Sequence, residues 1–213
     1  MTEYTKFLGV IIDQNLYFHK HIQYIKGKIA RGIGILYKCK VFFTQSTLLS
    51  MYNAFIYPYY NYCIAVWGNT FDCHLKPLVI LQKRAIRLIV GARKYEHSDP
   101  IFDSLKILKL KEIYIYSVQL FLFKFHYNNL PQFFDDFYQC NNITHSHNTR
   151  QQEMFRTPIL RSFPASRTIR ASGVHIYNYF VNVLDLNCSF LTFKYRLKQH
   201  ILNNTKIVEH TMK

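Results

Sequence analysis

The sequence predicts a mainly α-helical fold, with a short β segment at the N-terminus and a loop-rich, partly helical C-terminal region. Three observations support this. Apolar residues recur every three or four positions along several stretches before residue 128, which is the spacing of a helix face. One short apolar run, residues 7–12, precedes the turn residues Asp13, Gln14 and Asn15, as is typical of a strand. Beyond Cys140 the chain is rich in Ser, Asn, Thr and Arg, and helical spacing returns only at residues 191–202.

The first predicted helix lies between the strand and residue 40. Arg31 and Lys38 fall opposite its apolar face, and Lys26 and Lys28 flank it. Each glycine inside this helix costs up to ~1 kcal/mol relative to alanine, so the helix needs tertiary support. The apolar face consists of Ile22, Ile25, Ile29, Ile33 and Leu36.

Two further helices are predicted before residue 92. Thr44 or Ser46 caps the first, and Pro58 kinks or ends it. Pro77 suits the first position of the second, and Gly91 suits its end. The second helix is amphipathic, with a stripe of Leu78, Leu81, Ala85, Leu88 and Ile89 and a basic outer face of Lys83 and Arg87, which Arg84 flanks. Residues 111–127 are apolar nearly all round, which predicts a buried helix.

The charge balance points to a polyanionic partner. The chain holds 27 Lys and Arg against 12 Asp and Glu, a net charge of +15, together with 17 Tyr and 18 Phe. Phosphates attract cations and unpaired bases stack on aromatic rings, so this composition favours nucleic acid. The alternative is a basic surface that contacts only water. An anionic membrane surface is a weaker third interpretation, because packing uses the apolar faces of the basic helices.

One stretch raises the question of a membrane span. No charged residue occurs from Val41 to Phe71, which is long enough to cross a bilayer. Its many Ser, Thr, Asn and Gln residues favour a buried helical hairpin. The N-terminus lacks the layout of a signal peptide, and the five cysteines show no disulfide or zinc spacing. We expect an intracellular protein of the nucleus or cytoplasm, not secreted and without a membrane partner.

The residues offer no catalytic centre. FFDD, residues 133–136, contains the paired carboxylates used in two-metal nucleotidyl transfer, but that chemistry also needs a third carboxylate from an earlier strand. FFDD follows a helix end, so we interpret it as an acidic turn. The pairs His19/His21 and His145/His147 have no further ligand at metal spacing, and we interpret them as surface histidines. We expect no catalytic residue, no metal ligand and no cofactor in this chain.

Seven motifs then occur in one order. They are TKFLGVIID (5–13), LLSMYNAFIYPYYNYCIAVWG (48–68), LQKRAIRLIVGAR (81–93), DSLKILKLKEIYIY (103–116), NNLPQFF (128–134), HSHNTR (145–150) and SFLTFKYRLKQHIL (189–202). Together they resemble the thumb and post-thumb part of non-LTR (LINE-type) retrotransposon reverse transcriptases. The chain departs from that pattern where the family has Leu-Trp-Asn, because it reads Ile176-Tyr177-Asn178.

The resemblance implies an organisation. Residues 1–16 would be a remnant of the palm end, 17–98 a helical thumb-like region, 99–140 a helical post-thumb segment and 141–213 a loop-rich region with a terminal helix. Phe7, Leu8 and Gly9 match the palm–thumb junction near the primer end. The expected contacts to phosphates are Lys26, Lys28, Arg31, Lys83, Arg84, Arg87, Arg93 and Lys94.

We therefore expect a nucleic-acid-binding C-terminal fragment of an RNA-directed DNA polymerase. Its partners would be RNA or an RNA–DNA hybrid, bound independently of sequence, and the missing N-terminal part of the polymerase. Mg²⁺ is implied for the full-length enzyme, and this chain is not expected to polymerise alone because the strands with the metal-binding aspartates are expected to be absent. The alternative is a basic, all-helical interaction or scaffold protein that does not bind nucleic acid.

Overall fold

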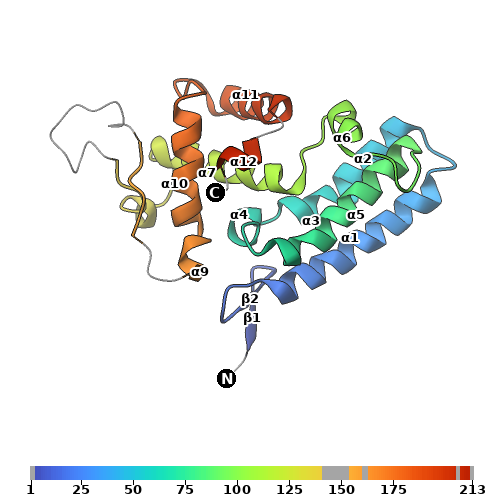
Figure 1. Ribbon diagram of the computed structural model, residues 1–213, viewed down its shortest axis with the longest axis horizontal. Helices are drawn as coiled ribbons and strands as arrows, with labels where there is room; N and C mark the ends of the chain where they lie inside the picture. The colour runs from blue at the N-terminus through green and yellow to red at the C-terminus, as the bar shows by residue number, and fades with distance from the viewer. Residues whose placement is uncertain (1–2, 141–153, 160–162, 205–206, 212–213) are drawn as a thin grey trace. The chain divides into compact units, whose positions relative to one another are not determined.

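The computed structural model describes residues 3–140, 154–159, 163–204 and 207–211, and within them the chain is mainly α-helical (Figure 1). This confirms the predicted fold class. The chain divides into two compact units, Met1–Ile113 and Tyr114–Lys213, so the division falls inside one helix. The elements are β1 (Tyr4–Phe7), β2 (Val10–Asp13), α1 (His19–Cys39), α2 (Gln45–Phe55), α3 (Tyr57–Asn61), α4 (Ile64–Trp67), α5 (Asp72–Val90), α6 (Asp99–Leu105), α7 (Leu110–His126), η1 (Gln132–Phe134), α9 (Phe163–Ser166), α10 (Ile169–Val181), α11 (Phe190–Asn203) and α12 (Ile207–Thr211).

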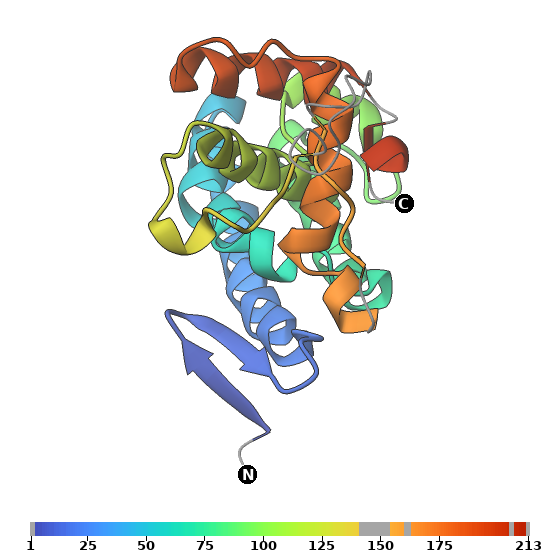
Figure 2. The ribbon, with the colours of Figure 1, turned by 90° about the vertical axis from the view of Figure 1, so that its left-hand side faces the viewer.

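The N-terminal β segment is a hairpin that stands at the beginning of α1 (Figure 2). The single strand predicted over residues 7–12 is wrong, because Leu8 and Gly9 turn the chain with φ of 45° and 84°. A two-residue turn with both φ values positive matches the twist of the two strands. Gly9 adopts this conformation without strain, and Tyr62 donates a hydrogen bond to the carbonyl of Leu8. Tyr4 pairs with Asp13 at the other end of the ladder.

The core of the first unit forms where α1, α2 and α5 pack together. The predicted apolar face of α1 is confirmed, since Ile22, Ile25, Ile29, Ile33 and Leu36 are all buried. On α2, Leu48 and Tyr52 are buried, and the predicted cap is confirmed because the Thr44 side chain accepts a hydrogen bond from the backbone N–H of Thr47. The cap satisfies one of the donors that a helix start leaves unpaired.

The uncharged stretch from Val41 to Phe71 folds into the short helices α2, α3 and α4. Pro58 lies in the first turn of α3, after α2 has ended at Phe55. Tyr52, Tyr60 and Trp67 are fully buried, whereas Phe42, Phe55 and Tyr62 of the same stretch are exposed. No helix in the described part of the chain is long and apolar enough to cross a membrane.

Helix α5 differs from the prediction at its start. It begins at Asp72, so Pro77 lies inside the helix and not at its first position. The missing N–H of Pro77 leaves the carbonyl of Cys73 without its helical donor. Burial of Leu75 and an ion pair between Asp72 and Lys111 at 2.8 Å hold the first turn. The buried face is correspondingly rotated and consists of Leu75, Leu78, Gln82, Ala85, Ile86 and Ile89, with Leu81 and Leu88 only half-buried.

The second unit has its own core. Phe123 of α7 stacks on Phe193 of α11, with ring centroids 4.1 Å apart. The helices predicted at 111–127 and 191–202 are confirmed as α7 and α11. Helix α10 lies where a loop was expected, and Val174 and Phe180 on it are fully buried. Its sequence, IRASGVHIYNYFV, has weak helix propensity, so the apolar face and not the backbone preference stabilises it.

Candidate nucleic-acid interface

The outer face of α1 carries a stripe of four cations, with Tyr24 and Ile35 between them. Six residues spaced by 4, 4, 3, 4 and 3 positions fall on one side of the helix, away from the buried isoleucines. Tyr24 and Ile35 are 40% and 45% exposed, and Lys28 is half-buried. We call this set the α1 stripe: Lys20, Tyr24, Lys28, Arg31, Ile35 and Lys38.

In the described part of the chain, the cations of the α1 stripe form no ion pair with a carboxylate. The sequence contains no Asp or Glu from residue 14 to residue 71. Within the described residues, the three ion pairs all lie elsewhere in the chain. No ion pair among the described residues therefore neutralises the charge on this face, although Glu3 and Asp13 line the pocket beside Lys20.

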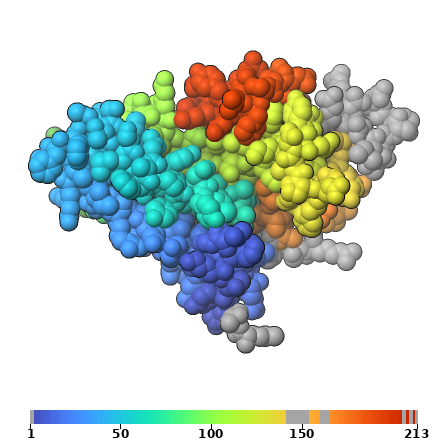
Figure 3. Space-filling model, turned by 180° about the vertical axis from the view of Figure 1, so that it is seen from behind, coloured from blue at the N-terminus to red at the C-terminus, as the bar shows by residue number. Residues whose placement is uncertain are grey.

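Tyrosine rings take the place of carboxylates beside these lysines. The ammonium groups of Lys6 and Lys28 lie 5.6 and 5.5 Å from the centre of the Tyr24 ring, and that of Lys20 lies 5.9 Å from the Tyr4 ring. Such cation–π contacts position the lysines and leave their charge in place. Figure 3 shows the hairpin (dark blue) and the start of α1 next to each other on the surface.

The three α1 cations expected to contact phosphates, Lys26, Lys28 and Arg31, do not share one face of the helix. Lys28 and Arg31 belong to the α1 stripe, and the Arg31 Nε–H donates to the carbonyl of Gly27. Lys26 is exposed on the opposite flank of the helix, about 160° from Lys28. One ligand along the α1 stripe therefore meets Lys28 and Arg31 but not Lys26.

The α5 cations are less available than expected. Arg84 is exposed, whereas Arg87 is half-buried and donates from Nε to the carbonyl of Glu96 at 2.8 Å. Lys83 is also half-buried. The pKa of Asp99 is lowered, mainly by the hydrogen bond that Lys109 donates to it. The nearby charge of Lys83 lowers that pKa further, so Lys83 interacts with Asp99. Lys83 and Arg87 thus interact with the protein itself, and Arg84 is the exposed one of the three α5 cations expected to contact phosphates.

Arg93 and Lys94 follow the end of α5, where Gly91 adopts φ 71°. Both are exposed. The backbone N–H of Arg93 donates to the Glu96 carboxylate at 3.1 Å, and the ammonium of Lys94 lies 5.2 Å from the centre of the Tyr95 ring. Their side-chain charges remain directed at solvent.

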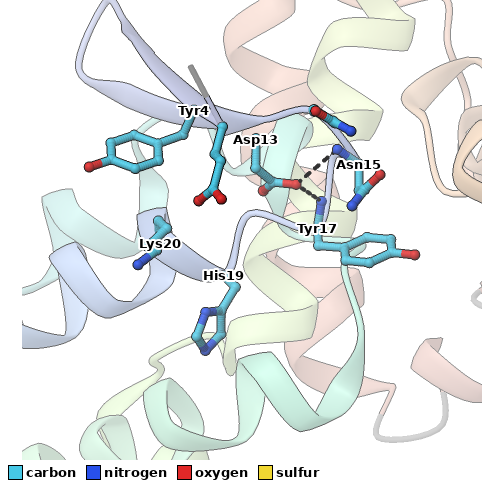
Figure 4. Close-up of a pocket in the computed structure, with 8 residues that line it drawn as sticks. Tyr4, Asp13, Asn15, Tyr17, His19 and Lys20 are labelled. Carbon is cyan, nitrogen blue, oxygen red and sulfur yellow. Dashed lines mark hydrogen bonds between the residues drawn. The ribbon is translucent and has the colours of Figure 1, made fainter. Parts of the chain in front are cut away.

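Phe7, Leu8 and Gly9 form the exposed tip of the hairpin, with Phe7 63% and Leu8 73% exposed. At the other end of β2, Asp13 organises the turn into α1 (Figure 4). Its carboxylate accepts hydrogen bonds from the backbone N–H groups of Asn15, Tyr17 and Phe18. The open pocket beside it is lined by groups of both signs, including Glu3, Asp13 and Lys20, so it favours no anion.

Gln82 has a structural role that the sequence analysis missed. Its side chain is buried, donates from Nε2 to the Leu108 carbonyl at 2.9 Å and accepts at Oε1 from the Leu110 N–H at 3.0 Å. Nε2 also donates to the hydroxyl of Tyr52. The signal in the sequence was a glutamine on the apolar face of an amphipathic helix, where an unpaired amide is costly.

The residues described do not fit a two-metal centre. Asp135 and Asp136 are exposed in a turn after η1 and not in a β-hairpin. No group of three or more His, Cys, Asp or Glu side chains suited to a metal occurs among the described residues. His21 is buried, so its interpretation as a surface histidine is wrong, whereas His19 is exposed. His145 and His147 lie outside the described residues.

His21 packs between the hairpin and α4. Its Nδ1 accepts from the backbone N–H of Ile11 at 3.4 Å, and its ring meets that of Trp67 edge-on. Burial lowers its pKa to about 4. The ring is therefore neutral near pH 7 and adds no charge to the α1 stripe.

About half of the chain is similar to RNA-directed DNA polymerases of transposable elements. One relative is the probable RNA-directed DNA polymerase from transposon X-element of Drosophila melanogaster, 28% identical over 106 residues, which are 48% of this chain and 12% of that protein. Two others are the RNA-directed DNA polymerases from mobile element jockey of Drosophila melanogaster and Drosophila funebris. They are 30% identical over 109 residues and 29% identical over 108 residues, which are 49% of this chain and 12% of each relative.

This similarity confirms the resemblance to non-LTR retrotransposon reverse transcriptases that the ordered motifs indicated. The matched part spans only 12% of the length of these relatives. No family model matches the chain. No solved structure matches it significantly either.

Proposed function

We propose that this chain binds nucleic acid independently of sequence, as the C-terminal part of a retrotransposon reverse transcriptase. It would contact the phosphate backbone of a template–primer duplex, an RNA–DNA hybrid. The observation that carries the proposal is the α1 stripe, whose four cations, three of them exposed, form no ion pair among the described residues. Polymerisation itself is not assigned to this chain, because its described residues do not fit the metal site of that reaction.

The physical basis is counterion release. Unpaired lysines and arginines in a row are attracted to a row of phosphates, and each contact releases a condensed cation from the nucleic acid. Contacts to phosphates carry no sequence information, so binding is insensitive to base sequence. Arg84, Arg93 and Lys94 extend the set of exposed cations, whereas Lys83 and Arg87 contribute less because they interact with the protein itself.

The test is a fluorescence anisotropy titration of a labelled RNA–DNA hybrid with the full chain at increasing NaCl concentration. We expect the logarithm of the binding constant to fall linearly with the logarithm of salt, by about 0.9 for each phosphate contact. Two hybrids of different sequence should bind equally well. Absence of binding at low salt would favour the alternative, a basic interaction or scaffold protein whose charge only faces water.

A further inference from the structure

The second unit contains a pocket whose lining includes no residue of the α1 stripe. It lies at the beginning of α10 and has a volume of about 240 Å³. Two arginines, an amide and a hydroxyl face it, with two apolar residues beside them. Its lining consists of Gln139, Arg156, Thr157, Pro158, Ile159 and Arg170.

The segment with Arg156 is fixed in position by its neighbour. Phe155 is buried and stacks on Tyr177, with ring centroids 3.8 Å apart. The Asn178 side chain accepts from the Phe155 N–H at 2.8 Å and donates to the Phe155 carbonyl at 3.0 Å. The Arg156 N–H in turn donates to the Gln139 carbonyl at 2.8 Å. The backbone at Phe155 and Arg156 is thus held by hydrogen bonds to Asn178 of α10 and to Gln139.

The second arginine is held separately. Arg170 lies in the first turn of α10, and its guanidinium carbon is 5.7 Å from the centre of the Phe137 ring. Tyr138 anchors the same region, because its hydroxyl donates to the Ile169 carbonyl at 2.6 Å. Stacking on an aromatic ring leaves the N–H groups of a guanidinium available in their plane.

Neither arginine has an acidic partner in the described part of the chain. No carboxylate lines the pocket. The only ion pair among the described residues of this unit joins Arg196 and Asp185, at 3.8 Å. Asp135 and Asp136 precede Phe137 in the chain, yet neither forms an ion pair with the arginines. Two guanidinium groups and no carboxylate make the pocket complementary to an anion.

We propose that this pocket binds a phosphate group of a nucleic-acid strand, which gives the second unit its own contact with the ligand. Arg156 and Arg170 would donate to the phosphate oxygens, with Gln139 and Thr157 as further donors. Pro158 and Ile159 provide an apolar wall for the adjoining sugar. This inference rests on the proposed function for the source of the phosphate, but its residues are separate from the α1 stripe.

The test compares Arg156→Gln/Arg170→Gln with the parent chain in the same anisotropy titration. We expect about tenfold weaker binding at moderate salt and a salt slope reduced by one to two phosphate contacts. The matched control is Lys194→Gln/Arg196→Gln, which removes two cations of the same unit from α11 and should change binding less than twofold. Arg156→Lys/Arg170→Lys keeps the charge but loses the bidentate hydrogen-bonding geometry of the guanidinium groups. Its affinity should therefore lie between those of the parent and of Arg156→Gln/Arg170→Gln.

A second measurement reports on the pocket directly. Arginine Nε–H signals of the ¹⁵N-labelled full chain are followed by NMR, and those of Arg156 and Arg170 are expected to shift as a short single-stranded RNA is added. One outcome would overturn this inference but leave the proposed function standing. In it, the parent chain binds RNA, the Arg156 and Arg170 signals do not shift, and Arg156→Gln/Arg170→Gln keeps the affinity of the parent. No binding by the parent chain would overturn the proposed function as well. Shifts caused by phosphatidic acid vesicles and not by RNA would contradict a nucleic-acid ligand.

Discussion

Gln82 shows how one polar side chain connects three parts of the first unit. It lies on the buried face of α5 and bonds to the backbone on either side of Lys109, where the chain enters α7. Replacement by Met keeps the shape and leaves a carbonyl and an N–H buried without partners. An unpaired buried group costs about 1–3 kcal/mol, so Gln82→Met should lower the free energy of unfolding by about 2–5 kcal/mol.

Urea denaturation of the parent and of Gln82→Met measures that difference. The control is Lys76→Met on the same helix, because Lys76 is exposed and its replacement should change stability by less than about 0.5 kcal/mol. Equal stability of Gln82→Met and the parent would show that the three hydrogen bonds of Gln82 do not contribute.

His21 predicts a pH dependence of stability. Its pKa falls from 6.5 to about 4 on folding because the ring is buried. Between these values the unfolded chain binds a proton that the folded chain does not, so stability declines as the pH drops from about 6.5 towards about 4. The decline attributable to this group is at most about 1.4 kcal/mol per pH unit. Thermal unfolding at several pH values measures it, and His21→Gln should flatten the curve in that window.

Helix α1 offers a matched comparison among its glycines. A Cβ added at Gly27 or Gly34 would meet nothing within 4 Å, whereas one at Gly32 would lie 2.7 Å from Ile56 Cγ1 and 3.2 Å from the Phe55 carbonyl oxygen. Gly34→Ala should therefore stabilise the chain by about 0.5–1 kcal/mol, because Ala favours the helix. Gly32→Ala should destabilise it, because α1 and α2 must separate.

Differential scanning calorimetry distinguishes these two effects through melting temperatures that move in opposite directions. A stabilising Gly32→Ala would contradict close packing of α2 against α1 at this position. Gly34→Ala lies near the α1 stripe without removing a cation, so nucleic-acid binding should be unchanged in that variant.

At the scale of elements, periodicity predicted helices better than their boundaries. The face of α1 followed directly from its isoleucines because one helical repeat runs undisturbed from Ile22 to Leu36. The start of α5 was misplaced because Pro77 suits a first turn, whereas burial of Leu75 extends the helix towards Asp72. The hairpin was read as one strand because the apolar run hides a turn that only the positive φ values of Leu8 and Gly9 reveal.

Helix α10 was not predicted because its local sequence does not favour a helix. Gly173 lies inside this helix, where an added Cβ would collide with the Tyr138 hydroxyl, so glycine permits close packing at a cost in helix propensity. Contacts of this kind join residues far apart in sequence, and periodicity carries no information about them.

The candidate site was predictable to a similar extent. The sequence identifies the cations, and the structure confirms that Arg31 is exposed. On α5 the predicted faces are wrong, because Lys83 and Arg87 are half-buried and the flanking Arg84 is exposed. The sequence did not indicate that Arg87 donates a hydrogen bond to the Glu96 carbonyl or that Asp99 attracts Lys83. Both interactions depend on how the loop after Gly91 folds. The sequence did not indicate the pocket of Arg156 and Arg170 either, because its lining residues come from three separate positions in the chain.

For the whole molecule, a net charge of +15 alone fits many partners. Its distribution is more informative. A basic stripe without carboxylates lies on the first unit, and a separate pocket with two arginines lies on the second. The relatives named as RNA-directed DNA polymerases make a nucleic acid the partner to test first.

The most direct test of nucleic-acid binding through the α1 stripe is the affinity of Lys28→Gln/Arg31→Gln for the RNA–DNA hybrid. The matched control, Lys194→Gln/Lys198→Gln, removes two exposed cations from α11. We predict that the α1 variant binds about tenfold more weakly, with a salt slope smaller by about two phosphate contacts, and that the control stays within twofold of the parent. Equal affinities of both variants and the parent would contradict the assignment of the α1 stripe to phosphate binding.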